Sequence, residues 1–313
     1  MRTLFVLNPC SGHNRRNPGL ARSVRDFISA RHLDAELATT EARGHATELT
    51  RHAVQRGSEV VVAIGGDGTM NEIAQGLIGS PAALALVPCG SGNGLARFLR
   101  LPRSFIAALA LASGTTPRIL NMDTGTANGH PFVNAMGLGL DANVSWRFNQ
   151  LTRRGLPAYA RVAWNTLRTL QPERVVIDGA NRSVALDVLL VTIANSDQYG
   201  NNARIAPRAR VDDGQLDLVA IRAISLGQAA ALVPRLFLGN LDRSPHVLRL
   251  PGPRFTIARR ERGLIHTDGE THLTDARVVV DVRPQSLRVI VPALPARAAR
   301  TLTLLPPTTR LVS

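Results

Sequence analysis

The sequence of 313 residues contains no lysine, so all 37 of its basic residues are arginines. This absence excludes chemistry that needs a lysine amine, such as a Schiff base or the lysine of a Walker-A phosphate loop. Arginine is always charged and suits phosphates and anionic surfaces. With only 23 acidic residues the formal net charge is +14, so nucleic acid and an anionic membrane surface are the candidate partners.

Cysteine, aromatic residues and long apolar runs are also scarce. Two cysteines, Cys10 and Cys89, do not make a disulfide framework. Aromatic residues make up 4% of the chain and offer few platforms for stacking bases, so we expect no nucleic-acid partner. No run approaches the roughly 18 apolar residues of a membrane span, and the apolar start at Met1–Leu7 is too short for a signal peptide. We therefore expect a cytoplasmic protein without a transmembrane segment.

A glycine-rich turn is the most informative stretch of the chain. The apolar run Val60–Ile64 predicts a strand buried on both faces, and a helix is predicted over Met70–Leu77. The turn between them reads Gly65-Gly66-Asp67-Gly68-Thr69 and is suited to bind phosphate, because glycines permit close backbone approach and the first helical amides lack internal partners. Asp67 repels phosphate, so we expect it to hold a Mg²⁺ between them or to accept a hydrogen bond from a hydroxyl.

Two further strands of the first third also end in turn residues. Thr3–Leu7 is followed by Asn8–Gly12, and Ala83–Val87 by the glycine-rich loop Gly90–Gly94. Strand patterns alternate with helix patterns here, which predicts an α/β domain with a parallel sheet over residues 1–124. Ligands of such sheets bind beyond the carboxyl ends of the strands. The three loops are therefore expected to meet in one site.

The pattern changes near residue 125. A hairpin signal at Asn128-Gly129 and a helical stretch over Ala142–Leu170 are followed by many short strands separated by Asp-Gly and Pro-Gly turns. A helix predicted at Leu226–Gly239 interrupts them. Residues 125–292 are therefore predicted to form an antiparallel β-sandwich. Pattern alone does not place residues 293–313.

Four ordered motifs resemble those of the diacylglycerol kinase and sphingosine kinase superfamily. They are Asn8-Pro9-x-Ser11-Gly12, Gly65-Gly66-Asp67-Gly68-Thr69-x-Asn71-Glu72, Pro88-x-Gly90-Ser91-Gly92-Asn93-x-Leu95-Ala96-Arg97 and Asp268-Gly269-Glu270. The resemblance covers nearly the whole chain. It implies a nucleotide domain related to those of NAD kinase and phosphofructokinase, a β-sandwich carrying the lipid site, and a tail (293–313) that packs back on the first domain. The implied activity is that of a soluble bacterial lipid kinase, which uses ATP and Mg²⁺ to phosphorylate a lipid hydroxyl.

The resemblance also implies roles for single residues. Asp268 is expected to be the general base on the substrate hydroxyl, because a turn at a strand end can project a carboxylate into a cleft. Further acidic candidates for catalysis are Asp67, Asp123 and Glu270, and Asp67 is also the candidate ligand of a catalytic Mg²⁺. Expected nucleotide-binding residues are Asn8, Ser11, Gly12, Arg15, Gly65, Gly66, Asp67, Gly68, Thr69, Asn71, Glu72, Gly90, Ser91, Gly92 and Asn93.

Three other stretches carry weaker implications. Val211–Asp217 resembles a loop that holds a structural Mg²⁺ through carboxylates and backbone oxygens in some bacterial relatives, with Asp212 and Asp217 as the carboxylate ligands, although by itself it reads as a hairpin turn. His266 is an alternative base by residue type, but a lone histidine on a strand is more often structural. Phe132, Asn134, Gly137, Gly139 and Asp141 match a further family stretch, in which Asn134 is expected to support the cleft.

The acceptor lipid and two alternative functions stay open. Ser91 and Gly94 stand where diacylglycerol kinases usually have Thr and Asp, and this form is closer to sphingosine and ceramide kinases. The acceptor is therefore a diacylglycerol, a sphingoid or ceramide, or a related lipid. The alternatives are an NAD kinase-like phosphotransferase and a catalytically inactive module that binds nucleotide or a membrane surface. We expect the arginines to hold the protein peripherally on an anionic membrane; a homodimer is compatible with the sequence but not decided by it.

Overall fold

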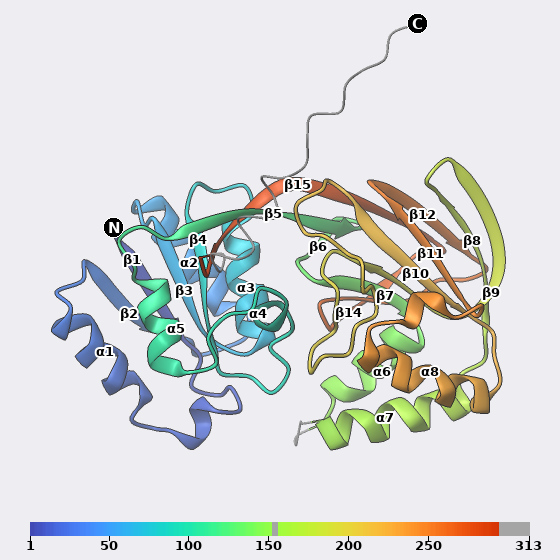
Figure 1. Ribbon diagram of the computed structural model, residues 1–313, viewed down its shortest axis with the longest axis horizontal. Helices are drawn as coiled ribbons and strands as arrows, with labels where there is room; N and C mark the ends of the chain where they lie inside the picture. The colour runs from blue at the N-terminus through green and yellow to red at the C-terminus, as the bar shows by residue number, and fades with distance from the viewer. Residues whose placement is uncertain (152–155, 294–313) are drawn as a thin grey trace, which may run out of the picture.

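The computed structural model describes residues 1–151 and 156–293. In the first part, the strands β1 to β4 are parallel and lie side by side in the order β2-β1-β3-β4 (Figure 1). This arrangement confirms the predicted parallel α/β domain. Its elements are β1 (Thr3–Leu7), η1 (Asn14–Arg16), α1 (Leu20–Ala30), β2 (Ala35–Thr39), α2 (His45–Gln55), β3 (Val60–Gly65), α3 (Asp67–Leu77), β4 (Ala83–Pro88), α4 (Gly94–Phe98) and α5 (Phe105–Ala112).

Helices cover both faces of this parallel sheet, which explains why its strands are continuous apolar runs. On β3, Val61 and Ala63 face the core formed with α2 and α3, whereas Val62 and Ile64 face the core formed with α1 and α5. All four side chains are at most 2% exposed. The carboxyl ends of the strands remain the free edge at which loops can bind a ligand.

The second part is an antiparallel sandwich with helices at one side, as predicted (Figure 1). The hairpin predicted at Asn128-Gly129 joins β5 to β6. The predicted helical stretch is two helices, α6 and α7. The elements are β5 (Arg118–Ala127), β6 (His130–Phe132), β7 (Ala135–Gly139), α6 (Leu140–Asn149), α7 (Leu156–Thr169), β8 (Glu173–Gly179), β9 (Arg182–Ala194), β10 (Leu216–Arg222), α8 (Leu226–Leu238), η2 (Leu241–Arg243), β11 (Val247–Gly252), β12 (Arg254–Arg259), β13 (Gly263–Thr267), β14 (Glu270–Thr274) and β15 (Arg277–Val291).

Two long strands, β5 and β15, run through both parts and join them into one sheet (Figure 1). β15 pairs with β12 of the sandwich near its start, and in parallel with β4 through Arg288 and Val289 near its end. β15 is one continuous strand with an irregularity between Arg283 and Leu287. The predicted boundary at residues 124 and 125 falls inside β5.

Two expectations concern the membrane and the tail. Among the described helices, none has the length and apolar character needed to cross a bilayer. The predicted packing of residues 293–313 on the first domain lies, apart from Ala293, outside the described residues.

Candidate active site

Hydrogen bonds join the three strand-end loops of the first domain to one another. The Asn8 side-chain amide in the first loop donates to Thr69 Oγ1 in the second at 2.9 Å. The His13 amide donates to the carbonyl of Cys89 in the third loop at 3.2 Å. The predicted convergence of the loops at one edge of the sheet is therefore confirmed.

Asp67 ties the second loop to the third. Its Oδ1 accepts a hydrogen bond from the Gly94 amide at 2.7 Å, and its Oδ2 accepts one from the Asn93 amide at 2.8 Å. Burial raises the pKa of Asp67, although these two hydrogen bonds oppose the rise. From the sequence we expected Mg²⁺ or a hydroxyl as the partner, whereas the structure shows backbone amides. Each oxygen keeps one further acceptor position.

The second and third loops are in direct backbone contact. A Cβ on Gly90 would lie 2.6 Å from the Gly66 Cα, and a Cβ on Gly92 would lie 2.8 Å from Asp67 Oδ2. Glycine is thus required for the loops to approach so closely. By contrast, a Cβ on Gly12 or Gly68 would meet no atom within 4 Å, so both positions face open space into which a ligand could fit.

Asparagines fix the shape of the loops. Asn93, in the left-handed region with φ of 50°, accepts from the Gly90 amide and donates to the Gly90 carbonyl. Asn14, which sequence reasoning missed, donates to the carbonyls of Asn8 and Ile64. The Oδ1 atoms of Asn14 and Asn71 are buried acceptors without a partner in the described chain. A ligand or water that donates hydrogen bonds would satisfy them.

The remaining predicted nucleotide residues occupy different surroundings. Ser11 Oγ donates to the Asn8 carbonyl, and Ser91 is exposed at the tip of the third loop. Arg15 and its neighbour Arg16 are exposed on η1, directly after the first loop. Glu72 instead faces α2: its Oε2 accepts from the Ala46 amide at 3.2 Å. This contact packs α3 on α2 and gives Glu72 a structural role.

Asp268 is held in the β13–β14 turn, where it and Gly269 have φ of 50° and 87°. Its carboxylate accepts three amide hydrogen bonds from the segment that leads into β7 and from the first residue of that strand: Val133 at 2.6 Å on Oδ2, and Asn134 and Ala135 at 2.9 Å on Oδ1. Burial raises the pKa of Asp268, and the three amides oppose the rise. Because an oxygen can accept two hydrogen bonds, Oδ2 retains a position for a substrate hydroxyl.

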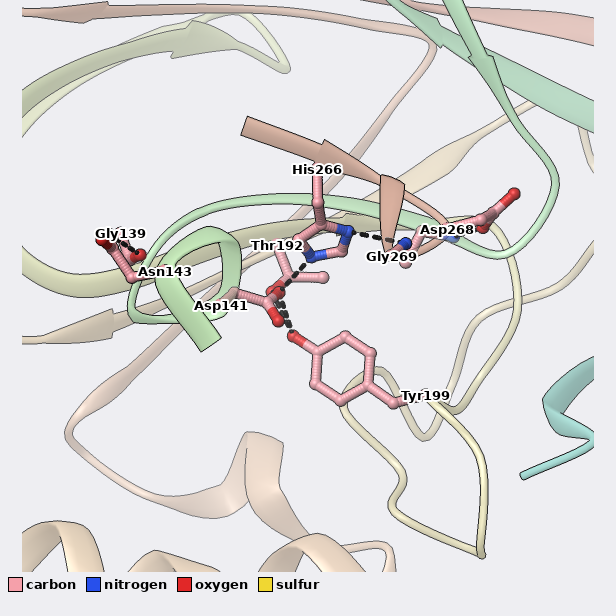
Figure 2. A network of polar contacts seen from close by, with 9 residues as sticks. Gly139, Asp141, Asn143, Thr192, Tyr199, His266, Asp268 and Gly269 are labelled. Atoms are coloured by element: carbon pink, nitrogen blue, oxygen red, sulfur yellow. Dashed lines mark hydrogen bonds and ion pairs between the residues drawn. The ribbon is translucent and has the colours of Figure 1, made fainter. Parts of the chain in front are cut away.

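A buried polar network lies behind this turn (Figure 2). The Gly269 amide donates to His266 Nδ1 at 3.3 Å, and His266 Nε2 lies 3.0 Å from Asp141 Oδ2. The same Asp141 oxygen accepts from the Tyr199 hydroxyl at 2.7 Å and from Thr192 Oγ1 at 2.9 Å. His266, the alternative base, is therefore committed to Asp141.

In this network His266 and Asp141 each shift the pKa of the other in the direction that favours its charged form. Burial by itself would lower the pKa of His266, but the Asp141 carboxylate raises it above the ordinary value. Burial would likewise raise the pKa of Asp141, but His266 together with the Tyr199 and Thr192 hydroxyls lowers it. Each of the two residues therefore favours the charged form of the other. In the contacts found here, His266 Nδ1 accepts from the Gly269 amide, so the ring is neutral and its Nε2–H donates to Asp141.

The loop that carries Tyr199 also reaches the third glycine loop. The Asn201 amide donates to the Gly92 carbonyl at 3.4 Å, and a Cβ on Gly94 would lie 3.3 Å from the Tyr199 carbonyl oxygen. Through Tyr199 the network thus connects the Asp268 turn with the glycine loops of the first domain. Tyr199 and Thr192 were missed, although Gly200-Asn201-Asn202 after a strand was a turn signal.

The other two acidic candidates link distant parts of the chain. Glu270 pairs with Arg43 of the first domain, with 2.7 Å between Oε1 and Nη2. Asp123 is fully buried and accepts from the Gly214 and Gln285 amides, both at 2.7 Å. Asp123 thereby ties β5 to two loops at the junction, and its carboxylate serves the fold.

The two carboxylates predicted to hold a structural Mg²⁺ each lie beside an arginine. Asp217 on β10 pairs with Arg249 on the neighbouring β11 at 2.5 Å, and Asp212 pairs with Arg210 at 3.4 Å. Within the described residues no group of three or more His, Cys, Asp or Glu side chains could hold a metal ion. A site of two carboxylates and backbone oxygens needs no third such side chain, so the structural Mg²⁺ stays a prediction, and the guanidinium groups would compete with the cation for these carboxylates.

Comparisons with known proteins agree with the fold and the motifs. Residues 2–131 match the family model described as the diacylglycerol kinase catalytic domain, and residues 134–291 match the YegS C-terminal NAD kinase beta sandwich-like domain. The chain is 27% identical to "Diacylglycerol kinase" of Bacillus subtilis (strain 168), over 86% of this chain and 89% of that protein. It is 29% identical to "Probable lipid kinase YegS-like" of Klebsiella pneumoniae (strain 342), over 93% and 96%.

Solved structures show the same architecture. A Bacillus anthracis (strain Sterne) protein, named provisionally as a diacylglycerol kinase, superposes with a TM-score of 0.76 at 23% identity, covering 93% of this chain and 97% of that one. An NAD kinase from Archaeoglobus fulgidus in complex with ATP gives 0.55 at 13% identity, covering 97% of each. The fold is thus that of the two-domain kinases related to NAD kinase. Within that class, the chain belongs to the diacylglycerol kinase superfamily of lipid kinases.

Proposed function

We propose that the protein transfers the γ-phosphoryl group of ATP to a hydroxyl of a membrane lipid. The observation that carries the proposal is the connection between the glycine loops and the Asp268 turn through Tyr199, Asp141 and His266. This connection supports a single bonded unit that combines a phosphate-type site with a fixed carboxylate. The names of the relatives and the ATP bound to the NAD kinase neighbour support the same activity.

The chain's own groups suit the two halves of the reaction. The glycine loops and the first amides of α3 orient the phosphates, while Asp67 keeps the second and third loops together. Asp268 Oδ2 accepts the proton of the lipid hydroxyl while the oxygen of that hydroxyl forms a bond to the γ-phosphorus of ATP. The bond between the γ-phosphorus and the oxygen that bridges it to the β-phosphate breaks, and ADP is released. The His266–Asp141 pair holds the turn from behind.

Mg²⁺ belongs to this proposal as the ion that ATP phosphates carry. It neutralises the negative charge that develops during phosphoryl transfer. Mg²⁺ usually takes only one or two protein carboxylates and keeps several waters. Asp67, with a spare acceptor position on each oxygen, is the residue of the glycine loops that could hold it.

The test is transfer of radiolabelled γ-phosphate to lipids in mixed micelles. The panel contains diacylglycerol, sphingosine, ceramide, phosphatidylglycerol and monoacylglycerol, with NAD as a soluble control. We expect label in one lipid class and a fall of about 10²–10⁴-fold in Asp268→Asn, which keeps the size of the side chain. Label in NAD alone would favour the NAD kinase-like alternative, and ATP binding without transfer to any acceptor would favour the inactive module.

A further inference from the structure

Three helices of the sandwich domain expose apolar side chains on their outer side. We define the α7–α8 face as Trp164 of α7 with Leu226, Val233, Phe237 and Leu238 of α8. Trp164 is 48% exposed and Leu238 is 73% exposed. Trp146 of α6, 44% exposed, is on the same helical layer. Figure 1 shows α6, α7 and α8 along the same side of the sandwich.

The fold does not use the outer side of these helices. Their inner sides share one core, to which α6 contributes Leu140, α7 contributes Leu167, and α8 contributes Leu232 and Leu236. On α8 only Ala229 and Leu232 are buried, and Arg235 is its one charged residue. A surface helix of a globular protein normally presents polar residues to water. An apolar outer side on a well-capped helix therefore indicates a binding surface.

The charge around the face indicates what it binds. Residues 142–172 and 218–241 contain no Asp or Glu. The same segments place Arg147, Arg161, Arg168 and Arg222 at exposed positions. Exposed apolar and aromatic tips on helices α7 and α8, whose charged residues are all arginines, complement the acyl chains and headgroups of an anionic bilayer. A protein partner of average composition would leave these arginines unmatched.

The helical layer also contacts the candidate active site. The side-chain amide of Asn149, at the end of α6, donates to the Gly269 carbonyl at 2.7 Å. Gly269 directly follows Asp268 in the β13–β14 turn. A bilayer seated on this layer is therefore connected through one helix to the residue that would receive the lipid hydroxyl proton.

We propose that the α7–α8 face docks on an anionic phospholipid bilayer, with Trp164, Phe237 and Leu238 entering the headgroup region. This inference rests on the proposed lipid kinase function, because it explains how the enzyme reaches a substrate that stays in the membrane. It names the surface, whereas net charge alone would allow any arginine-rich part of the molecule to bind.

The chain contains only two tryptophans, Trp146 and Trp164, so its own fluorescence can report docking. In a Trp146→Phe protein only Trp164 remains. Vesicles of phosphatidylglycerol and phosphatidylcholine should shift its emission to the blue, and brominated acyl chains should quench it. Pure phosphatidylcholine vesicles or high salt should weaken the response. An emission unchanged by anionic vesicles would overturn the proposal.

A double variant, Phe237→Ser with Leu238→Ser, tests the face directly in a vesicle flotation assay. We expect its affinity for anionic vesicles to fall about tenfold or more, because two apolar side chains are lost from the interface. Ile106→Ser is the matched control, since Ile106 is 58% exposed but lies on α5 of the other domain. Equal binding by the double variant and the control would overturn the proposal, as would a blue shift caused by self-association without vesicles.

Failure of the docking proposal is distinguishable from failure of the proposed function. Transfer of phosphate to a short-chain lipid below its micelle concentration does not require a membrane. The double variant should retain this transfer while it loses transfer to the same lipid in anionic vesicles. If it retains both, the docking face is wrong and the function stands. If the wild-type protein transfers to neither, the proposed function fails, whereas the vesicle-binding results still decide the docking surface.

Discussion

At the scale of single residues, acidic side chains that lie in similar sequence motifs have different roles in the structure. Asp67 and Asp268 both follow strands, both accept backbone amide hydrogen bonds, and both have a pKa raised by burial. Asp67, however, joins two loops of one domain, whereas Asp268 is held at a turn of the other. Asp123 and Glu72 carry contacts of the fold. The role of a carboxylate in a sequence motif therefore depends on the groups that surround it in the structure.

Replacing Asp67 by Asn should weaken nucleotide binding. An amide nitrogen in place of one oxygen would face the Asn93 or the Gly94 amide donor and push the second and third loops apart. Hydrogen bonds to charged groups contribute about 1.5–3 kcal/mol, so we expect ATP affinity in calorimetric titration to fall at least about tenfold. Glu72→Gln, which changes a carboxylate facing α2, should bind ATP within about a factor of two of the wild type. Wild-type affinity in Asp67→Asn would contradict the role of Asp67.

At the scale of elements, the buried His266–Asp141 pair couples β13, α6 and the loop carrying Tyr199. Removing one partner of a buried ion pair typically costs about 3–5 kcal/mol. The Asp141→Asn substitution should therefore lower the free energy of unfolding by about 3–5 kcal/mol near pH 6. Asp187 forms a surface ion pair with Arg174, so Asp187→Asn is the matched control. This substitution should lower the free energy of unfolding by less than about 1 kcal/mol.

This destabilisation should depend on pH with a definite sign. The pKa of His266 is raised in the folded protein, so its stabilisation is complete below the unfolded value of about 6.5 and is lost as pH rises through the folded value. The pKa of Asp141 is lowered, so its stabilisation is present above about pH 3.9 and is lost as pH falls through the folded value. Urea unfolding between pH 5 and 9 should show the gap between wild type and Asp141→Asn shrinking at alkaline pH. A gap that widens there would refute the electrostatic coupling of His266 with Asp141.

Local patterns in the sequence predict elements well, and long-range partners poorly. The apolar run at Val60–Ile64 and the glycines after it identify a buried strand and a tight turn, because both are local requirements of the backbone. The pairing of Asp217 with Arg249 and that of Tyr199 with Asp141 depend on which strands and loops become neighbours. No spacing in the sequence specifies those neighbours, so the network of Tyr199 and Asp141 and the arginine beside Asp217 were missed.

At the scale of the whole molecule, stability should not require a divalent cation. Arg249 neutralises Asp217, and the described residues hold no cluster of metal-ligating side chains. We expect the melting temperature of the nucleotide-free protein to be the same in EDTA and in millimolar Mg²⁺. In Arg249→Gln the Asp217 carboxylate is left without its partner, so melting should occur at a lower temperature. A large stabilisation of the free wild-type protein by Mg²⁺ would show a structural metal site that this pairing does not account for.

The continuous sheet also sets the order in which the molecule can be completed during synthesis. The edge of β4 is covered by Arg288 and Val289, which lie near the end of β15 and 200 residues or more downstream of β4. While the ribosome is still making the sandwich, that edge has no partner strand, and open strand edges favour wrong pairing and aggregation. The parallel α/β half is thus translated first but finished almost last. Its closing contact therefore depends on a strand that also belongs to the sandwich, so neither half becomes complete before the other has been made.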